Sequence, residues 1–154
     1  MRAVVQRVTR AQVSVHGRVI GSIGRGAVVL VGVAREDTAG HAARLARKVA
    51  ALRIFDDAEG RMNLDAAAAG GAFLCVSQFT LYGDLRRGNR PSWERAAPPE
   101  LARPLFDAFV TALRETGVPC ESGEFGAEML VELVNDGPVT LILDTDDLER
   151  PRRA

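Results

Sequence analysis

Four consecutive residues, Ser77-Gln78-Phe79-Thr80, carry the clearest chemical signal in this sequence. They place two polar side chains, an aromatic ring and a hydroxyl at the end of an apolar run, 72–79, that is typical of a buried strand. Backbone N–H groups leave the hydrogen-bonded ladder where a strand ends, and two such groups can stabilise an oxyanion. The segment alone is also typical of a polar strand end that leads into a loop.

A second candidate is the segment Asn135-Asp136-Gly137-Pro138-Val139-Thr140. A Gly-Pro pair between two strands usually makes a hairpin turn, and the spacing alone favours that interpretation. The bond before proline is also the common place for a cis peptide. A cis bond at Gly137–Pro138 would turn two carbonyls toward one side and form a rigid wall of acceptors.

The common metal and nucleophile systems are absent from the sequence pattern. The two histidines, His16 and His41, have no partner at ligand spacing, so we expect no metal and no other cofactor. Cys75 lies in the middle of an apolar run, which is typical of a small buried hydrophobic residue. The glycines at 21, 24 and 26 lead into a strand rather than a helix, so they do not form a phosphate loop.

The elements that would position these residues alternate between strands and helices. Extended runs are expected at 3–16, 19–23, 27–34, 53–55, 72–79, 128–134 and 139–144, with a turn at 135–138. Helical spacing predicts one helix from Asp37 or Thr38 to about Leu52 and another over roughly 100–116. We therefore predict an α/β fold with one mixed, largely antiparallel, barrel-like sheet and two main helices packed on it. The domain is expected over 1–145, followed by a mobile polar tail at 146–154.

Length and charge limit the classes of function. A chain of 154 residues is the length of one domain, and its 20 basic and 20 acidic residues give a net charge of zero. This balance argues against a protein that holds nucleic acid by bulk positive charge, although loop 80–99 carries a local excess of arginines. The first residues do not form a signal peptide, and no apolar run reaches the length of a membrane helix. We expect a cytoplasmic protein without a membrane partner.

The two polar segments together resemble the motifs of the D-aminoacyl-tRNA deacylases. The similarity rests on SQFTL and NDGPVT, and it extends over most of the chain. It includes the opening AVVQRVTRAQVSV, the stretch IFDDAEGRMNL and the strand GGAFLCVSQFTL. It also includes RPSW, where the family often has phenylalanine in place of Trp93.

This resemblance implies hydrolysis of the ester between a D-amino acid, or glycine, and the terminal adenosine of tRNA. It implies a homodimer with active sites at the interface, which would bind the acceptor end of aminoacylated tRNA. It assigns catalysis to Ser77, Gln78, Phe79 and Thr80. It assigns substrate binding and chiral selectivity to Gly137, Pro138, Arg7, Phe125 and Met129. In this scheme a cis Gly-Pro reaches into the other subunit's pocket, and Arg7 orients it.

Two alternatives remain open at this point. A related tRNA deacylase could remove glycine or a mischarged L-alanine, with the same chemistry and a different substrate. A non-catalytic tRNA-binding module would keep the fold without the reaction. The attacking group is also open: Thr80 has no base near it in sequence, so we favour water oriented with help from the ribose 2′-hydroxyl.

Overall fold

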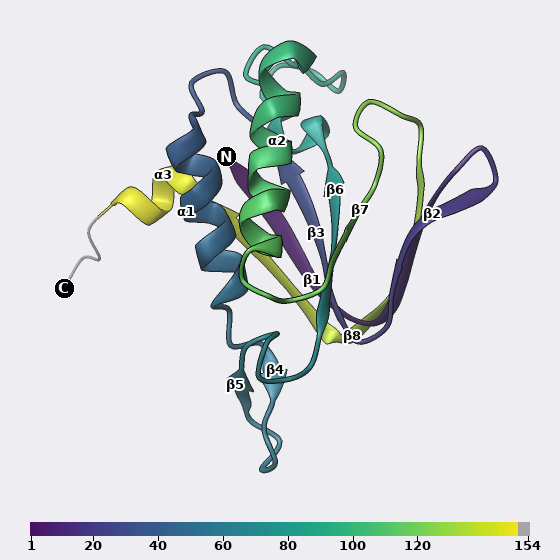
Figure 1. The fold of residues 1–154 in the computed structure, drawn as a ribbon. Helices are drawn as coiled ribbons and strands as arrows, with labels where there is room; N and C mark the ends of the chain where they lie inside the picture. The colour runs from purple at the N-terminus through teal and green to yellow at the C-terminus, as the bar shows by residue number, and fades with distance from the viewer. Residues whose placement is uncertain (151–154) are drawn as a thin grey trace.

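The structure is a computed structural model that describes residues 1–150. Figure 1 shows one strongly curved sheet with two helices lying side by side against one of its faces. The helices are α1 (Ala39–Ala50) and α2 (Pro99–Arg114). The sheet contains β1 (Arg2–Val15), β2 (Arg18–Ile23), β3 (Gly26–Gly32), β6 (Ala72–Ser77), β7 (Cys120–Ser122) and β8 (Leu130–Asp144).

The strand order is β2-β1-β3-β6-β7, and β8 also pairs with β1. β1 is antiparallel to β2, β3 and β8, whereas β3, β6 and β7 run parallel to one another. β2 curls back toward the far side of the sheet: a Cβ atom built on Gly21 would lie 3.2 Å from the Leu74 side chain and 3.2 Å from the Ser122 carbonyl. The sheet is thus nearly closed, which confirms the predicted mixed, barrel-like fold with two main helices.

β3 is covered on both faces, as its uninterrupted apolar sequence predicted. Ala27, Val29 and Val31 face the large core shared with the helices, and Val28 faces a second core inside the curved sheet. All four are buried, and each fully buried valine contributes about 1.5–3 kcal/mol. The strand therefore fixes the position of β6 beside it.

The two helices bury the faces that their sequences predicted. Thr38 is the N-cap of α1, and Ala42, Leu45, Ala46 and Val49 point into the core. In α2 the buried residues include Leu105, Phe109 and Leu113, while Leu101, one helical turn before Leu105, remains 36% exposed. The two apolar faces meet over the sheet and close the larger core.

The hairpin predicted at residues 135–138 is wrong. β8 pairs antiparallel with β1 both before and after this segment, from Leu130 opposite Ser14 to Asp144 opposite Arg2. Asn135 pairs with Val8 and Thr140 with Gln6, so residues 136–139 bulge out opposite Arg7 alone. Because the chain does not reverse, the Gly-Pro pair interrupts one long strand instead of joining two.

The structure contains several short elements that the sequence pattern does not predict. The loop expected at 56–63 belongs to a small hairpin of β4 (Phe55–Asp56) and β5 (Met62–Leu64). The run 72–79 stops being a strand at Ser77, and Phe79–Tyr82 forms a single turn of 3₁₀-helix, η1. β7 was not predicted at all.

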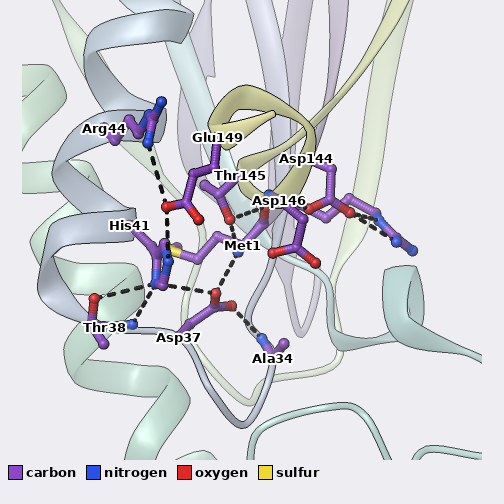
Figure 2. A network of polar contacts seen from close by, with 11 residues as sticks. Met1, Ala34, Asp37, Thr38, His41, Arg44, Asp144, Thr145, Asp146 and Glu149 are labelled. Carbon is purple, nitrogen blue, oxygen red and sulfur yellow. Dashed lines mark hydrogen bonds and ion pairs between the residues drawn. The ribbon is translucent and has the colours of Figure 1, made fainter. Parts of the chain in front are cut away.

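A helix occupies the start of the segment that was expected to be a mobile tail. Thr145–Glu149 forms α3, and Thr145 is fully buried. Figure 2 shows why: the Met1 ammonium donates to the Thr145 hydroxyl at 2.6 Å and to the Asp37 carboxylate at 2.6 Å. His41 lies between Asp37 and Glu149, with its ring nitrogens 3.6 and 3.5 Å from their carboxylates. The rest of the expected tail, 151–154, lies outside the described residues.

No helix within residues 1–150 is both long enough and apolar enough to span a membrane.

Gly26 offers a test of the β3–β6 pairing. A Cβ atom at this position would lie 1.8 Å from the Ala72 carbonyl oxygen, and this atom belongs to the backbone and cannot turn away. We expect Gly26→Ala to lower the free energy of unfolding by about 3 kcal/mol, measured by urea denaturation. Gly24→Ala is the matched control, because nothing lies within 4 Å of its Cβ. Equal stability of the two variants would contradict this account of the pairing.

Candidate active site

The segment Ser77-Gln78-Phe79-Thr80 lies where β6 ends. The Gln78 N–H still donates to the Val31 carbonyl of β3 at 2.8 Å, so the ladder holds the chain up to this residue. Phe79 and Thr80 are the first residues of η1, and their N–H groups have no acceptor inside this helix. Neither N–H donates a hydrogen bond to any other group within residues 1–150. Two adjacent backbone donors are therefore free at this strand end.

A cavity of about 570 Å³ opens beside this strand end. Its volume is within the range of small-molecule sites in proteins, about 300–1,000 Å³. Four parts of the chain line it: Val33 after β3, the end of β6 with the start of η1, the segment that leads into α2 with its first turn, and the residues before and within β8. The lining residues are Val33, Val76, Ser77, Gln78, Phe79, Trp93, Ala96, Ala97, Pro98, Pro99, Ala102, Phe125, Gly126, Ala127, Met129 and Val131. Five of the nine predicted site residues thus share one cavity.

Aromatic rings form part of the cavity wall. Phe79 is 57% exposed, and its ring meets the edge of Trp93 at a centroid distance of 5.0 Å. On another part of the wall, the Arg103 guanidinium stacks over Phe125 at 5.0 Å from the ring centroid. Such rings offer flat apolar faces to a planar ligand.

The Thr80 hydroxyl has a side-chain amide as its hydrogen-bond partner. It accepts a hydrogen bond from the side-chain amide of Gln78, and it is not part of the cavity lining. No histidine or carboxylate within residues 1–150 hydrogen-bonds to this hydroxyl. The surroundings of Thr80 supply no base that would activate it as a nucleophile.

Cys75, two residues before Ser77, is fully buried in β6. Its Sγ atom lies 3.6 Å from that of Cys120. This thiol–thiol hydrogen bond, together with burial, raises the pKa of Cys75 well above its ordinary value. The thiol stays protonated at neutral pH, so the interpretation of Cys75 as a buried core residue agrees with the structure.

Arg7, Gly137 and Pro138 form a second group. The Gly137–Pro138 bond is cis, as the resemblance to the deacylases implied. The buried Arg7 side chain donates from Nε to the Asp136 carbonyl at 3.1 Å and from Nη1 to the Ile54 carbonyl at 2.8 Å. Gly137 has a φ of +125°, and its Cβ position lies 3.2 Å from Arg7 Nη2, so the bulge requires glycine here.

The two groups do not meet within one chain. Arg7 pairs with Ala27 near the start of β3, while Ser77 pairs with Val31 near its end. Four residues of strand separate these levels, which is about 13 Å along the sheet. Neither Gly137 nor Pro138 lines the cavity.

Some site residues were not found by sequence reasoning. Trp93 enters the sequence pattern only as part of RPSW, and residues 96–99 fall within the predicted loop 80–99. Alanines and prolines carry no chemical signal, and only the three-dimensional packing shows that they form a wall. Within residues 1–150, no three His, Cys, Asp or Glu residues gather to hold a metal ion.

Two solved structures superpose on most of this chain. A solved structure named "c-Myc DNA Unwinding Element Binding Protein" superposes with a TM-score of 0.88 at 42% identity and covers 94% of this chain and 98% of its own. Another, described as "a probable eukaryotic D-amino acid tRNA deacylase", has a TM-score of 0.77 at 17% identity and covers 92% of this chain and 97% of its own. Both solved structures thus share the fold of this chain over nearly its whole length.

Sequence comparison makes the assignment specific. The model of the D-Tyr-tRNA(Tyr) deacylase family matches residues 4–144, and the chain belongs to this family. A D-aminoacyl-tRNA deacylase of Anaeromyxobacter dehalogenans is 61% identical over 94% of this chain and 97% of its own. One from Chloroflexus aurantiacus is 56% identical over 100% of this chain and 96% of its own.

Trp93 provides a test of the cavity wall. We expect Trp93→Ala to lower kcat/KM by about tenfold, because it removes an aromatic contact worth about 0.5–1.5 kcal/mol. Trp93→Phe should stay within about threefold of the parent, since a phenyl ring can keep the edge contact with Phe79. The measurement is the rate of hydrolysis of D-tyrosyl-tRNA, the molecule in the family's name. An unimpaired alanine variant would show that the ring has no part in the site.

Proposed function

We propose that this chain hydrolyses the ester bond between a D-amino acid and the terminal adenosine of tRNA, releasing free tRNA and the D-amino acid. The observation that carries the proposal is family membership over residues 4–144, combined with a cavity that has Ser77, Gln78 and Phe79 in its wall. Relatives that share 56–61% of their residues with this chain bear the name D-aminoacyl-tRNA deacylase. The reaction keeps D-residues out of protein synthesis, and we place it in the cytoplasm with translation.

In the proposed reaction, the N–H groups of Phe79 and Thr80 donate to the ester carbonyl oxygen as it becomes an oxyanion. A water oxygen attacks the carbonyl carbon, and the bond from this carbon to the ribose oxygen breaks. The proton released by the water goes to the ribose oxygen. The unused backbone donors at the start of η1 support this role.

The proposed mechanism needs no histidine. An aminoacyl ester is already activated, so oriented water and a stabilised oxyanion lower the barrier enough for hydrolysis. The ribose 2′-hydroxyl of the substrate helps to orient the water. Thr80 is not the nucleophile in this scheme, because its hydroxyl has an amide as its neighbour and no base.

Chirality is proposed to be read by exclusion. The main-chain carbonyls of Gly137 and Pro138 of the partner subunit would face the α-carbon of the substrate. An L side chain would collide with these carbonyls, whereas a D side chain would point away from them. Glycine has no side chain to exclude, so glycyl-tRNA would also be hydrolysed.

Exclusion of L side chains by these carbonyls requires a homodimer. Gly137 and Pro138 lie far from the cavity of their own chain, so only a second copy can bring them to it. Exposed apolar side chains along β8 support such an interface. They are Leu130 (72% exposed), Val134 (41%) and Ile142 (75%). Residues of this kind on an outer strand are typical of surfaces that another chain covers.

Duplex DNA binding is less favoured, although one structural relative is named for a DNA element. The chain carries 20 basic and 20 acidic residues, so it lacks the bulk positive charge on which binding to the duplex backbone depends. The free backbone donors and the cavity beside them are features of a hydrolytic site instead.

Thr80→Ala separates the two possible mechanisms. With backbone donors as the oxyanion site, we expect the variant to keep kcat within about tenfold of the parent, since loss of a true oxyanion donor costs about 10²–10³ in kcat. Single-turnover hydrolysis of D-tyrosyl-tRNA measures the effect. Complete loss of activity, or a trapped ester on Thr80, would establish the covalent route instead.

The dimer is tested at Ile142. Ile142→Asp puts a charge on the apolar side of β8, so we expect a monomer by sedimentation and loss of at least about 90% of D-tyrosyl-tRNA hydrolysis, because burying an unpaired charge disrupts an interface. Met62→Asp is the matched control, because Met62 is 56% exposed on the separate β4–β5 hairpin. A fully active monomer would contradict the shared site.

A further inference from the structure

We propose that a second hollow, lined by Arg2, Tyr82, Gly83, Asp84, Arg86 and Arg95, binds a phosphate of the tRNA acceptor strand beside the terminal nucleoside. This inference rests on the proposed function, because it assumes that the terminal nucleoside occupies the large cavity. It adds a place where the enzyme holds the polynucleotide itself.

The position of this hollow follows from η1. Phe79, the first residue of η1, lines the large cavity, and Tyr82, its last residue, lines the second hollow. The two spaces meet where Gly83 and Trp93 touch: a Cβ atom on Gly83 would lie 2.9 Å from the indole ring. A chain that leaves the large cavity past Trp93 therefore reaches the second hollow directly.

The arginines of the hollow are organised around one buried ring. The guanidinium groups of Arg2 and Arg95 lie over the Tyr82 ring, at 4.8 and 5.6 Å from its centroid. Arg2 is fixed, since its Nε donates to Asp144 at 2.9 Å and its Nη1 to the Leu81 carbonyl at 2.8 Å. Arg2 is thus paired with a carboxylate and holds the Tyr82 ring in place, and Arg95 lies over the same ring.

The carboxylate of the hollow is already paired. Arg86 Nε lies 2.9 Å from both oxygens of Asp84, and this hydrogen bonding lowers the pKa of Asp84 to about 2. Asp84 remains ionised at neutral pH and holds Arg86 at the edge of the hollow. Arg86 is the main partner of this carboxylate, and the charge of Arg95 is the smallest of the causes that lower its pKa.

Arg95 is the free cation of the site. Its guanidinium forms no hydrogen bond or ion pair with the side chains or backbone of residues 1–150, while the backbone carbonyl of Arg95 is held by the Arg35 N–H at 3.2 Å. A guanidinium with unused donors matches the oxygens of a phosphate in a two-pronged geometry. Arg87 and Arg90 on the same exposed loop add positive charge nearby.

The size of the large cavity explains why a phosphate is the expected ligand. About 570 Å³ accommodates an aminoacyl group and one nucleoside, and the next nucleotides must remain outside. Every nucleotide of the acceptor strand carries a phosphate, and the one attached to the terminal nucleoside is the first to leave the cavity. The second hollow, about 240 Å³, lies beside that exit.

The test compares two substrates with the same ester. D-tyrosyl-tRNA carries the acceptor-strand phosphates, whereas D-tyrosyl-adenosine carries none. We would measure kcat/KM for both with the parent, Arg95→Gln and Arg95→Lys, between 50 and 200 mM NaCl, conditions under which phosphate contacts weaken strongly. Arg47→Gln is the matched control, since Arg47 is exposed on α1 and lies outside the hollow.

We expect Arg95→Gln to lower kcat/KM for D-tyrosyl-tRNA by about tenfold at low salt and to flatten its log–log salt slope by about 0.7, the value for one phosphate of a single strand. Its rate on D-tyrosyl-adenosine, and that of Arg47→Gln on both substrates, should match the parent within about twofold. Arg95→Lys keeps the charge but loses the two-pronged contact, so its kcat/KM on tRNA should lie between those of the parent and Arg95→Gln, with the salt slope of the parent. An unchanged salt slope, or an equal fall on both substrates, would overturn the phosphate site. A parent that hydrolyses neither substrate would instead overturn the proposed function.

Discussion

The pairing of β1 with three other strands is the constraint on which the rest of the molecule depends. β1 pairs with β8 over nearly its whole length, with β3 along its first half and with β2 along its second. Val5, Val8 and Val13 anchor it in the cores with no exposed surface. The bulge at 136–139 is held against Arg7 of this strand. β3, which pairs with β1, also pairs with β6 and so fixes the position of β6 relative to β1. Both groups of site residues are therefore positioned from one strand.

The cavity wall explains how the site could work with few polar groups. Alanine and proline side chains from the approach to α2 cover one side, and the strand end with its backbone donors forms another. Electrostatic interactions are stronger in such apolar surroundings than in water, so two N–H groups have a larger effect there than at an open surface. Because these donors belong to the backbone, the fold itself supplies them.

Most of the strands and both main helices could be predicted from the sequence, for identifiable reasons. The run 27–34 and the spacing of Ala42, Leu45 and Val49 carry strong periodic patterns, and both elements were predicted correctly. The Gly-Pro segment was misjudged, because local turn chemistry does not reveal whether the chain reverses or continues along the same neighbour. β7 has three residues, too few for periodicity to be detected. The second hollow brings Arg2 and Arg95 together over the Tyr82 ring, and no spacing in the sequence indicates this arrangement.

The place of β8 in the chain has a consequence for synthesis. β1 is synthesised well before its long partner, which comes from residues 130–144. Domains fold during synthesis as far as their contacts are available, and contacts between distant residues form late. Until residues 130–144 have been synthesised, one edge of β1 lacks its long partner. The sheet therefore reaches its final strand pairing only after β3, β6 and β7 have already been made.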